Sequence, residues 1–229
     1  MKKFLLLALA AMMVLSLAAC SSGSSTEEEQ QPQQLIIATG GTSGTYYPLG
    51  GGIAQIITDN TNVSATAQST GASVENMRLL QKGDVDLAFT QTDIADYASN
   101  GKLMFEGTKV ENLQGIATLY YETIQIVLPA NSDVNSVEDL AGKRVSVGAP
   151  GSGTEANASQ ILEVYGLTFD DLKTEYLSFG DSAQKIQDGN LDAAFVTAGA
   201  PTSAVTELSA TKGVKILNLD QEKIAELLS

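Results

Sequence analysis

The side chains that could do chemistry in this sequence are mostly hydroxyls and amides, and they lie beside glycines. There is no histidine and only one cysteine, Cys20, so Ser-His-Asp and Cys-His catalysis and histidine zinc sites are excluded. The acidic residues are scattered, and no Asp-x-(Asp/Asn)-x-(Asp/Asn)-Gly calcium loop occurs. Ser, Thr and Gln beside Gly are typical of sites that hold a small polar molecule. We therefore expect a binding protein without a cofactor, and not an enzyme.

One glycine-rich stretch, residues 148–154 (GAPGSGT), has the glycine spacing of a nucleotide-binding P-loop. The motif requires Lys at the next position and Ser or Thr after it, but Thr154 and Glu155 stand there. Without that Lys, and with a carboxylate in its place, the binding of a nucleoside triphosphate loses its main cation. We reject a P-loop on this ground.

The same stretch also matches the Gly-x-Gly-x-x-(Gly/Ala) fingerprint of dinucleotide sites, with Gly151, Gly153 and Ala156. The acid that would bind the ribose, Asp181, lies farther along the chain than is usual. The acidity of the protein is also unfavourable for a cofactor that carries a pyrophosphate. These two points weigh against a dinucleotide.

Both partial matches share glycines that bring backbone N–H groups at a helix N-terminus close to a ligand. The helix dipole and the free N–H groups there favour an anion such as a carboxylate, and residues 40–45 (GGTSGT) repeat the arrangement. Arginine occurs only at Arg78 and Arg144, so we expect N–H and hydroxyl donors to hold the anion. The alternative is that both loops are ordinary turns between a strand and a helix, which often need Gly and Ser.

The overall composition sets the class of protein. The chain is 43% hydrophobic, which is enough to bury a sizeable core. Thirteen Lys and Arg against 27 Asp and Glu give a formal net charge of −14. Such a charge would have to overcome phosphate repulsion, so we expect no nucleic-acid partner.

The N-terminus is typical of an exported lipoprotein. A basic start precedes an apolar run, and Leu17-Ala-Ala-Cys20 resembles the lipobox of bacterial lipoproteins. We interpret residues 1–19 as a signal peptide and residues 20–34 as a lipidated Cys20 with a flexible polar tether. The expected location is extracytoplasmic, with a lipid anchor in the bacterial membrane. The alternative is an uncleaved anchor with a buried cysteine.

From residue 35 onward the pattern is α/β, and it occurs twice. The string GDVDLAF at residues 83–89 is matched by GNLDAAF at residues 189–195. We expect a two-lobed fold with a parallel-sheet βαβ unit in each lobe, the first lobe at residues 35–122 and the second at residues 123–229. Expected strands are 35–39, 63–68, 85–90, 144–147, 175–179 and 191–196. Asp86 and Asp192 are equivalent in this repeat, so we expect them to serve turns rather than catalysis.

In open α/β sheets, ligands bind beyond the carboxyl ends of the strands. If the two lobes face each other, the loops at those ends line a cleft. These loops are rich in Ser, Thr, Gln and Gly, and they comprise residues 40–45, 69–71, 91–93, 149–154, 180–182 and 197–199. The tyrosine pairs at residues 46–47 and 120–121 could flank a ligand there, although single tyrosines more often pack.

Several of these strings resemble the TAXI family, the solute receptors of tripartite ATP-independent periplasmic (TRAP) transporters. The resemblance covers residue 35 to about residue 219 and is carried by residues 39–50 (TGGTSGTYYPLG), 69–76 (STGASVEN), 86–91 (DLAFTQ), 147–155 (VGAPGSGTE) and 192–201 (DAAFVTAGAP). It implies a periplasmic-binding-protein fold of type II that closes like a Venus flytrap on a small organic acid or amino acid, glutamate-like in some members. It also implies delivery to a TRAP membrane subunit.

The resemblance, carried over to the strand-end loops, implies a set of ligand-binding residues whose hydroxyls and amides orient the ligand. They are Ser43, Thr45, Tyr46, Ser69, Thr70, Gln91, Ser152, Thr154 and Gly199. Members of the family continue past the point where this sequence stops and return to complete the first lobe, so we expect a chain truncated at its C-terminus. Three alternatives remain open: an ABC-importer binding lipoprotein, an exported enzyme that uses Asp or Glu, and an immunogenic surface lipoprotein without transport activity.

Overall fold

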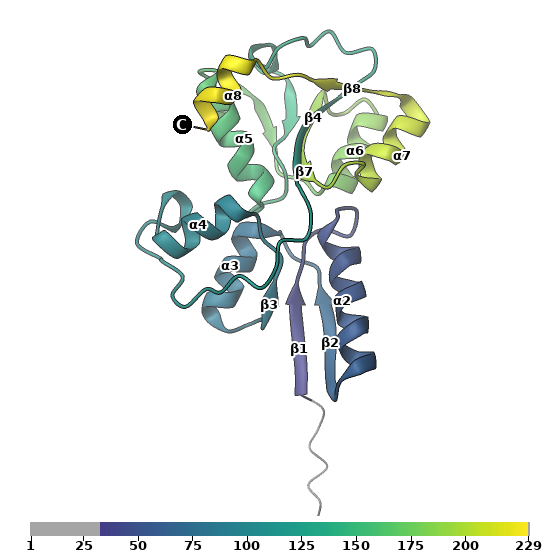
Figure 1. Cartoon of the computed structure of the whole chain (residues 1–229). Coiled ribbons are helices and arrows are strands. Elements are labelled where there is room, and N and C mark those ends of the chain that lie inside the picture. The colour runs from purple at the N-terminus through teal and green to yellow at the C-terminus, as the bar shows by residue number, and fades with distance from the viewer. Residues whose placement is uncertain (1–32, 229) are drawn as a thin grey trace, which may run out of the picture. The chain divides into compact units, whose positions relative to one another are not determined.

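The computed structural model describes residues 33–228, which contain two β-sheets flanked by helices (Figure 1). We call residues 33–122 the first half and residues 123–228 the second half. The predicted signal peptide, the predicted lipidation site Cys20 and the predicted tether as far as residue 32 lie outside the described residues. Within the described part, no helix is long and apolar enough to cross a membrane.

The first half is built on a three-stranded sheet of order β2-β1-β3, in which both pairings are parallel. Its strands and helices alternate along the chain. They are β1 (Gln33–Ala38), α2 (Tyr46–Asn60), β2 (Val63–Gln68), α3 (Ser73–Lys82), β3 (Leu87–Ala88) and α4 (Thr92–Asn100), followed by a 3-10 turn, η1 (Leu103–Phe105). This agrees with the expected βαβ unit, although β3 is shorter than the strand predicted at residues 85–90.

The second half carries a five-stranded sheet of order β6-β5-β7-β4-β8. Its elements are β4 (Thr123–Pro129), η2 (Glu138–Leu140), β5 (Arg144–Ser146), α5 (Gly153–Val164), η3 (Phe169–Asp171), β6 (Lys173–Glu175), α6 (Phe179–Gln187), β7 (Ala193–Ala198), α7 (Ser203–Lys212), β8 (Val214–Leu217) and α8 (Gln221–Leu227). The order β6-β5-β7 is parallel and repeats the order β2-β1-β3. The other two strands make this sheet mixed, because β4 pairs antiparallel with β7 and with β8.

The two equivalent aspartates, Asp86 and Asp192, have the same role in both halves. Asp86 accepts a hydrogen bond from the N–H of Ile36 at 2.8 Å, and its own N–H donates to the Ile36 carbonyl. Asp192 accepts from the N–H of Arg144 at 2.8 Å, and its own N–H donates to the Arg144 carbonyl. Each carboxylate therefore ties the start of the third strand to the first strand, which confirms a structural role.

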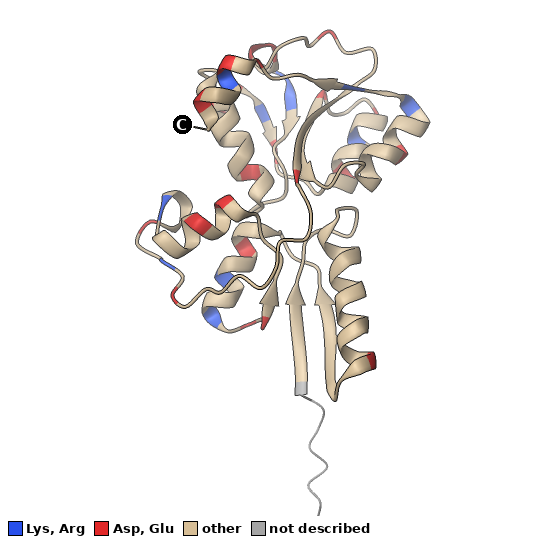
Figure 2. Ribbon diagram, in the orientation of Figure 1, with Lys and Arg blue, Asp and Glu red and all other residues tan. Residues whose placement is uncertain are grey.

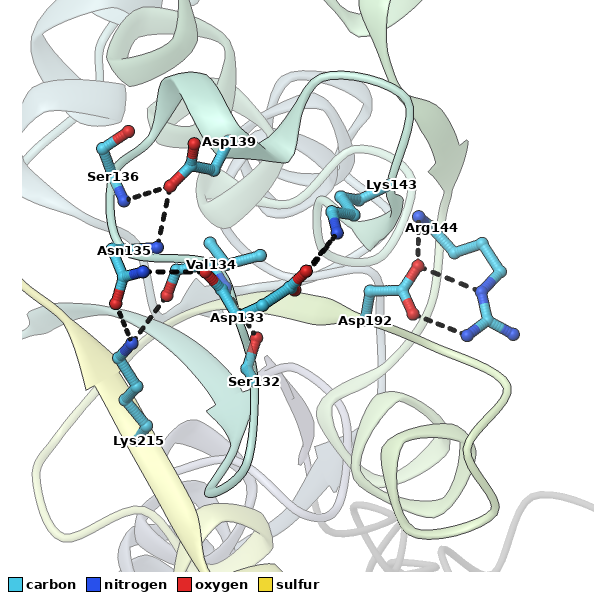
Figure 3. A network of polar contacts seen from close by, with 10 residues as sticks. All are labelled: Ser132, Asp133, Val134, Asn135, Ser136, Asp139, Lys143, Arg144, Asp192 and Lys215. Atoms are coloured by element: carbon cyan, nitrogen blue, oxygen red, sulfur yellow. Dashed lines mark hydrogen bonds and ion pairs between the residues drawn. The ribbon is translucent and has the colours of Figure 1, made fainter.

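In the second half the Arg144 side chain adds an ion pair to this arrangement. Its guanidinium donates to both oxygens of Asp192, at 3.1 and 2.6 Å (Figure 3). The neighbouring turn before η2 is held by Asp139, which accepts from the N–H groups of Asn135 and Ser136. These bonds lie at the amino ends of the strands and leave the opposite ends free for other contacts.

Strand β7 is the centre of the second half, since all six of its residues are buried. Phe195 packs on one face with residues of β4, β5 and α5, and Val196 packs on the other face with residues of α6 and α7. The core of the first half is smaller. Ile37 and Phe89 pack with α2, while Met77 and Phe105 pack between α3 and α4.

One other prediction about local structure was wrong. Residues 175–179 were expected as a strand, but β6 ends at Glu175 and Phe179 begins α6, because the Ser178 side chain accepts the N–H of Asp181 and caps that helix. Residues 113–122 cross from the first half without strand pairing, and β4 begins at Thr123.

Candidate functional site

The loops at the carboxyl ends of the strands line one cavity of about 260 Å³. This is close to the lower end of the range of roughly 300–1,000 Å³ for small-molecule sites. Both halves contribute residues. The lining consists of Gly40, Gly41, Thr42, Ser43, Gly44, Thr45, Tyr46, Ser69, Thr70, Gly71, Ala72, Ser73, Gln91 and Glu122 from the first half, and Ala149, Ser152, Gly153, Thr154, Ser178, Phe179, Thr197 and Ala198 from the second.

In the first half, the buried side chain of Asn76 on α3 fixes these loops. Its amide nitrogen donates to the carbonyls of Thr39 at 2.6 Å and Phe89 at 2.8 Å, and its oxygen accepts from the hydroxyl of Thr70. Thr39 follows β1, Thr70 follows β2 and Phe89 follows β3. One amide therefore holds three strand ends together, which positions the lining residues beside them.

In the second half, the loop before α5 is held by its own helix cap. Ser152 accepts from the N–H of Glu155 at 3.0 Å, and the Glu155 carboxylate accepts from the N–H of Gly151 at 2.7 Å. Gly148 has φ +102°, and a Cβ there would lie 2.8 Å from the Ser152 hydroxyl and from the Thr154 Cβ. Only glycine permits this turn. Ser152 uses the Glu155 N–H, and the N–H groups of Gly153 and Thr154 have no carbonyl one turn earlier, so these two are available to an acceptor in the cavity.

The two halves touch through polar contacts at the edge of the cavity. Gln91 donates to the side-chain oxygen of Asn157 on α5 at 2.6 Å, and the Asn157 amide donates to Asp93 at 3.0 Å. The N–H of Gly199 donates to the hydroxyl of Thr45 at 3.2 Å. These contacts are hydrogen bonds between small groups. Apolar contact between the halves comes from Ala156 on α5, which packs into the buried cluster of α3 and α4, while the other buried clusters lie within one half.

Gly153 is the point of closest approach between the halves. A Cβ on Gly153 would lie 1.4 Å from the side-chain oxygen of Gln91 and 3.1 Å from the Ser73 hydroxyl. No side chain fits in that space. The first turn of α5 therefore reaches the end of β3 only because residue 153 is glycine.

Glu122 brings a carboxylate to the cavity wall, between two tyrosines. The Tyr120 hydroxyl donates to one carboxylate oxygen at 2.9 Å and the Tyr46 hydroxyl donates to the other at 3.2 Å. Burial raises the pKa of the Glu122 carboxyl, while the two hydroxyls act in the opposite direction. Burial and the negative charge of Glu122 raise the pKa of both phenols, so they remain neutral donors.

Glu122 is the only charged residue in the lining, which contains no Lys or Arg. In Figure 2 the loops between the two sheets are largely tan, and the blue Lys and Arg positions lie on other elements. Helices α2, α3, α5 and α6 all begin at lining residues, namely Tyr46, Ser73, Gly153 and Phe179. Their N-termini bring the positive ends of four helix dipoles to the cavity wall without a basic side chain, although α3, α5 and α6 each carry an acidic residue in the first turn, namely Glu75, Glu155 and Asp181.

Eight of the nine residues predicted from the sequence line this cavity, and Gly199 lies next to it, bonded to Thr45. Their hydroxyls are not equally available. Ser69 donates to the Gly40 carbonyl at 2.9 Å, and Thr70 donates within the first half. Ser43 and Thr154 have no side-chain hydrogen bond to other described residues and are free to meet a ligand.

The remaining predicted residues have specific positions. Tyr46 is buried and contacts Ser73 and Glu122 through its hydroxyl. Gln91 faces Asn157, and Ser152 caps α5. Sequence reasoning missed Glu122, Ser73 and Asn157. Position in a strand-end loop gave no signal for them, because Glu122 precedes β4 and Asn157 lies one turn into α5.

No group of three or more acidic side chains in the described part of the chain is arranged to hold a metal ion. The described cavity therefore presents hydroxyls, amides, backbone N–H groups and one carboxylate. Together they can orient a small polar molecule and hydrogen-bond it on several sides.

A comparison of the sequence with models of known protein families identifies the family of this chain. Residues 37–229 match the model of the NMT1-like family. The chain belongs to the NMT1-like family. The resemblance to the TAXI family is a finer assignment, which this match does not show.

Solved structures share the fold at low sequence identity. The chain is similar to the alkanesulfonate-binding protein SsuA from Xanthomonas axonopodis pv. citri, bound to MOPS, with TM-score 0.54, 19% identity and coverage of 82% of this chain and 61% of that one. It is similar to the substrate-binding protein of an amino acid ABC transporter, with TM-score 0.54, 17% identity and coverage of 82% and 79%. It is also similar to a Gly52Ala mutant of an arginine-bound binding protein from T. maritima, with TM-score 0.54, 14% identity and coverage of 85% and 91%.

These similarities show the expected α/β fold of periplasmic binding proteins. The named structures are binding proteins rather than enzymes, in agreement with the prediction of a non-enzymatic chain. The chain spans about 60% of the length of the sulfonate-binding proteins that it matches.

Proposed function

We propose that this protein is an extracytoplasmic substrate-binding receptor that captures a small organic acid or amino acid and delivers it to a membrane transporter. The cavity between the strand-end loops of the two halves is the observation that carries this proposal. Its size, its hydroxyl groups and its four helix N-termini fit a small anionic molecule. Membership of the NMT1-like family and the fold of periplasmic binding proteins support it.

The two halves act in this proposal as lobes, residues 35–122 and residues 123–229, that close on the ligand. The contacts of Asn157 with Gln91 and Asp93 belong to the closed arrangement. Opening must also break the bond from the Glu75 N–H to the Gly151 carbonyl and separate Ala156 from the cluster of α3 and α4. Closure would exclude water from the ligand and strengthen its hydrogen bonds to Ser43, Thr154 and the backbone N–H groups.

The test of capture is a thermal melt of the full-length protein in detergent, with a panel of small organic acids, amino acids and sulfonates. A ligand at 100 times its dissociation constant adds ~2.7 kcal/mol. Each kcal/mol moves the midpoint by roughly 2–4 °C at this size, so a true ligand raises it by at least about 5 °C. A protein whose midpoint is unchanged by every compound is not a receptor for these classes, and an immunogenic surface lipoprotein without transport activity then becomes the better explanation.

For the membrane partner we propose the permease subunit of a TRAP transporter, on the basis of the TAXI-like strings. The second candidate is an ABC importer, which the similarity to binding proteins of ABC-type systems favours. Uptake by membrane vesicles that contain the purified receptor and the candidate permease distinguishes them. Uptake driven by an ion gradient without ATP supports the TRAP assignment, and strict dependence on ATP supports the importer.

We also propose that Cys20 carries a lipid that anchors the protein outside the cytoplasm. Mass spectrometry of the mature N-terminus, with the Cys20→Ala variant as control, tests this. A diacylglycerol-sized mass increase on a chain that begins at residue 20 is expected. An unmodified cysteine within an intact N-terminus would contradict it.

A further inference from the structure

The charge balance of the cavity points to the class of ligand. Glu122 is the only charged side chain in its lining. Among residues 33–228, none of the ion pairs involves Glu122. A carboxylate in a partly enclosed site with no basic partner usually has a charge to meet, because an unpaired buried charge is costly. No described lining residue supplies a cation to balance Glu122, and a ligand could supply one.

The Glu122 carboxylate is held in place for such a contact. Two phenol hydroxyls, from Tyr120 and Tyr46, fix one oxygen each. The Tyr46 ring lies against Phe89 at 5.2 Å and against Tyr120 at 6.4 Å between ring centroids, so the aromatic rings limit its movement. A carboxylate has about four acceptor positions, and the phenols use two of them. The others remain for an N–H donor.

Another part of the cavity can bind the negatively charged group of such a ligand. The N–H groups of the first turn of α5 and the free hydroxyls of Ser43 and Thr154 can receive an anion. A ligand whose acid group lies near the start of α5 and whose amine lies near Glu122 meets both requirements. A diacid without an amine satisfies the first and leaves Glu122 without a counter-charge.

We propose that Glu122 is the counter-charge for a ligand ammonium group, and hence that the ligand is an amino acid or a similar small zwitterion. This inference rests on the proposed receptor function and deepens it, because it selects amino acids over simple organic acids and sulfonates. The Ser73 hydroxyl, which lies 3.2 Å from that of Tyr46 and accepts from the N–H of Gln91, helps to fix the Tyr46 hydroxyl that holds Glu122.

Calorimetric titration of the full-length protein with matched pairs of compounds tests this. Each amino acid is compared with the acid that lacks only the amine: L-glutamate with glutarate, L-aspartate with succinate, and L-leucine with 4-methylpentanoate. At least one amino acid is expected to bind roughly 10- to 100-fold more tightly than its partner, as the loss of a hydrogen bond to a charged group predicts. Glu122→Gln should remove that preference, because the amino acid loses its counter-charge while the amine-free acid, no longer repelled by a carboxylate, binds at least as tightly as it binds wild type.

The control variant is Glu163→Gln, which makes the same charge change at an exposed position on α5 and should leave the preference intact. An amine-free acid that binds wild-type protein as tightly as its amino acid overturns the inference and leaves the receptor proposal standing. So does a preference that survives Glu122→Gln. Failure of every probe to bind overturns the receptor proposal itself for these compounds. If Glu122→Gln does not fold, the paired comparison on wild-type protein decides alone.

Discussion

Gln91 donates a hydrogen bond to Asn157 at 2.6 Å, and this bond joins the end of β3 in the first half to helix α5 in the second. Asn157 is buried, at 5% exposure, and its amide nitrogen donates at the same time to Asp93 at 3.0 Å. One amide therefore uses both of its polar atoms to hold the two halves together. It lies beside the cavity, since Gln91 also lines the wall.

Removing this amide should loosen the contact between the halves. Asn157→Ala leaves the Gln91 side chain and Asp93 without their partner, and we expect a loss of about 1–3 kcal/mol in the free energy of unfolding, measured with urea. Asn157→Asp should cost more, because it places a second carboxylate beside Asp93. The exposed Asn60→Ala, on α2, is the control and should stay within about 0.5 kcal/mol of wild type. An Asn157→Ala protein with the wild-type midpoint would contradict the assigned role.

The close approach at Gly153 gives a second prediction. In Gly153→Ala the new methyl group would overlap the Gln91 side chain, so Gln91 must move and the bond to Asn157 breaks. We expect a loss of about 1–3 kcal/mol in stability, the usual cost of overpacking. Adding Gln91→Ala should recover part of that loss in a double-mutant cycle. Strict additivity of the two changes would argue against the clash.

A glycine with free space around it provides the matched control. Gly52 lies in α2, and a Cβ there would meet nothing within 4 Å. Gly52→Ala should therefore stabilise the protein by about 0.4–1 kcal/mol, because alanine restricts the unfolded chain. Opposite signs for the two Gly→Ala changes would show that the effect at residue 153 comes from its surroundings.

Sequence patterns over a few residues were enough to predict the turns within each βαβ unit. The strings around Asp86 and Asp192 predicted two equivalent structural turns, and both aspartates bond the first strand of their own βαβ unit, β1 and β5. Helix α3 ends where Gly83 adopts φ +74°, the left-handed conformation in which glycine commonly ends a helix. These features depend on contacts within one βαβ unit, whose residues the sequence places in order.

Contacts between the halves could not be predicted in this way. The antiparallel pairing of β4 with β7 joins residues about 70 positions apart in the sequence, and no short motif predicts it. Glu122 belongs to the segment that crosses between the halves, so the rule about strand ends did not include it. Asn157 gave no signal either, because one polar residue in the first turns of a helix usually faces solvent. Nearly all of the predicted site residues came from the strand-end rule, and the missed ones came from outside it.

The Arg144–Asp192 pair predicts a dependence of stability on pH. The Arg144 guanidinium holds the pKa of the Asp192 carboxyl below its usual value of about 3.9. A carboxyl with a lowered pKa in the folded state stabilises the protein above that usual value and loses the effect as the pH falls. The stability difference between wild type and Asp192→Asn should thus be constant from pH 7 to 5 and shrink below about pH 4. In an Arg144→Gln background the shrinkage should become smaller, because only the backbone N–H of residue 144 still donates to Asp192. Urea unfolding across this pH range measures it, and a shrinkage of the wild-type size would contradict the role of the guanidinium.

Glu122 should produce the opposite dependence in the ligand-free protein. Burial raises the pKa of its carboxyl above the usual value of about 4.3, so the folded state retains a proton that the unfolded state has lost. The favourable contribution of the neutral form is fully present below about pH 4 and disappears as the pH rises through the raised pKa. Wild type should therefore lose stability relative to Glu122→Gln between pH 4 and pH 8, as measured by urea unfolding at each pH. Glutamine keeps a carbonyl oxygen that one of the two phenols, Tyr46 or Tyr120, can still donate to, so the comparison isolates the charge. A stability difference that is flat, or that changes in favour of wild type as the pH rises, would mean that the Glu122 carboxylate is fully solvated and not enclosed by the cavity.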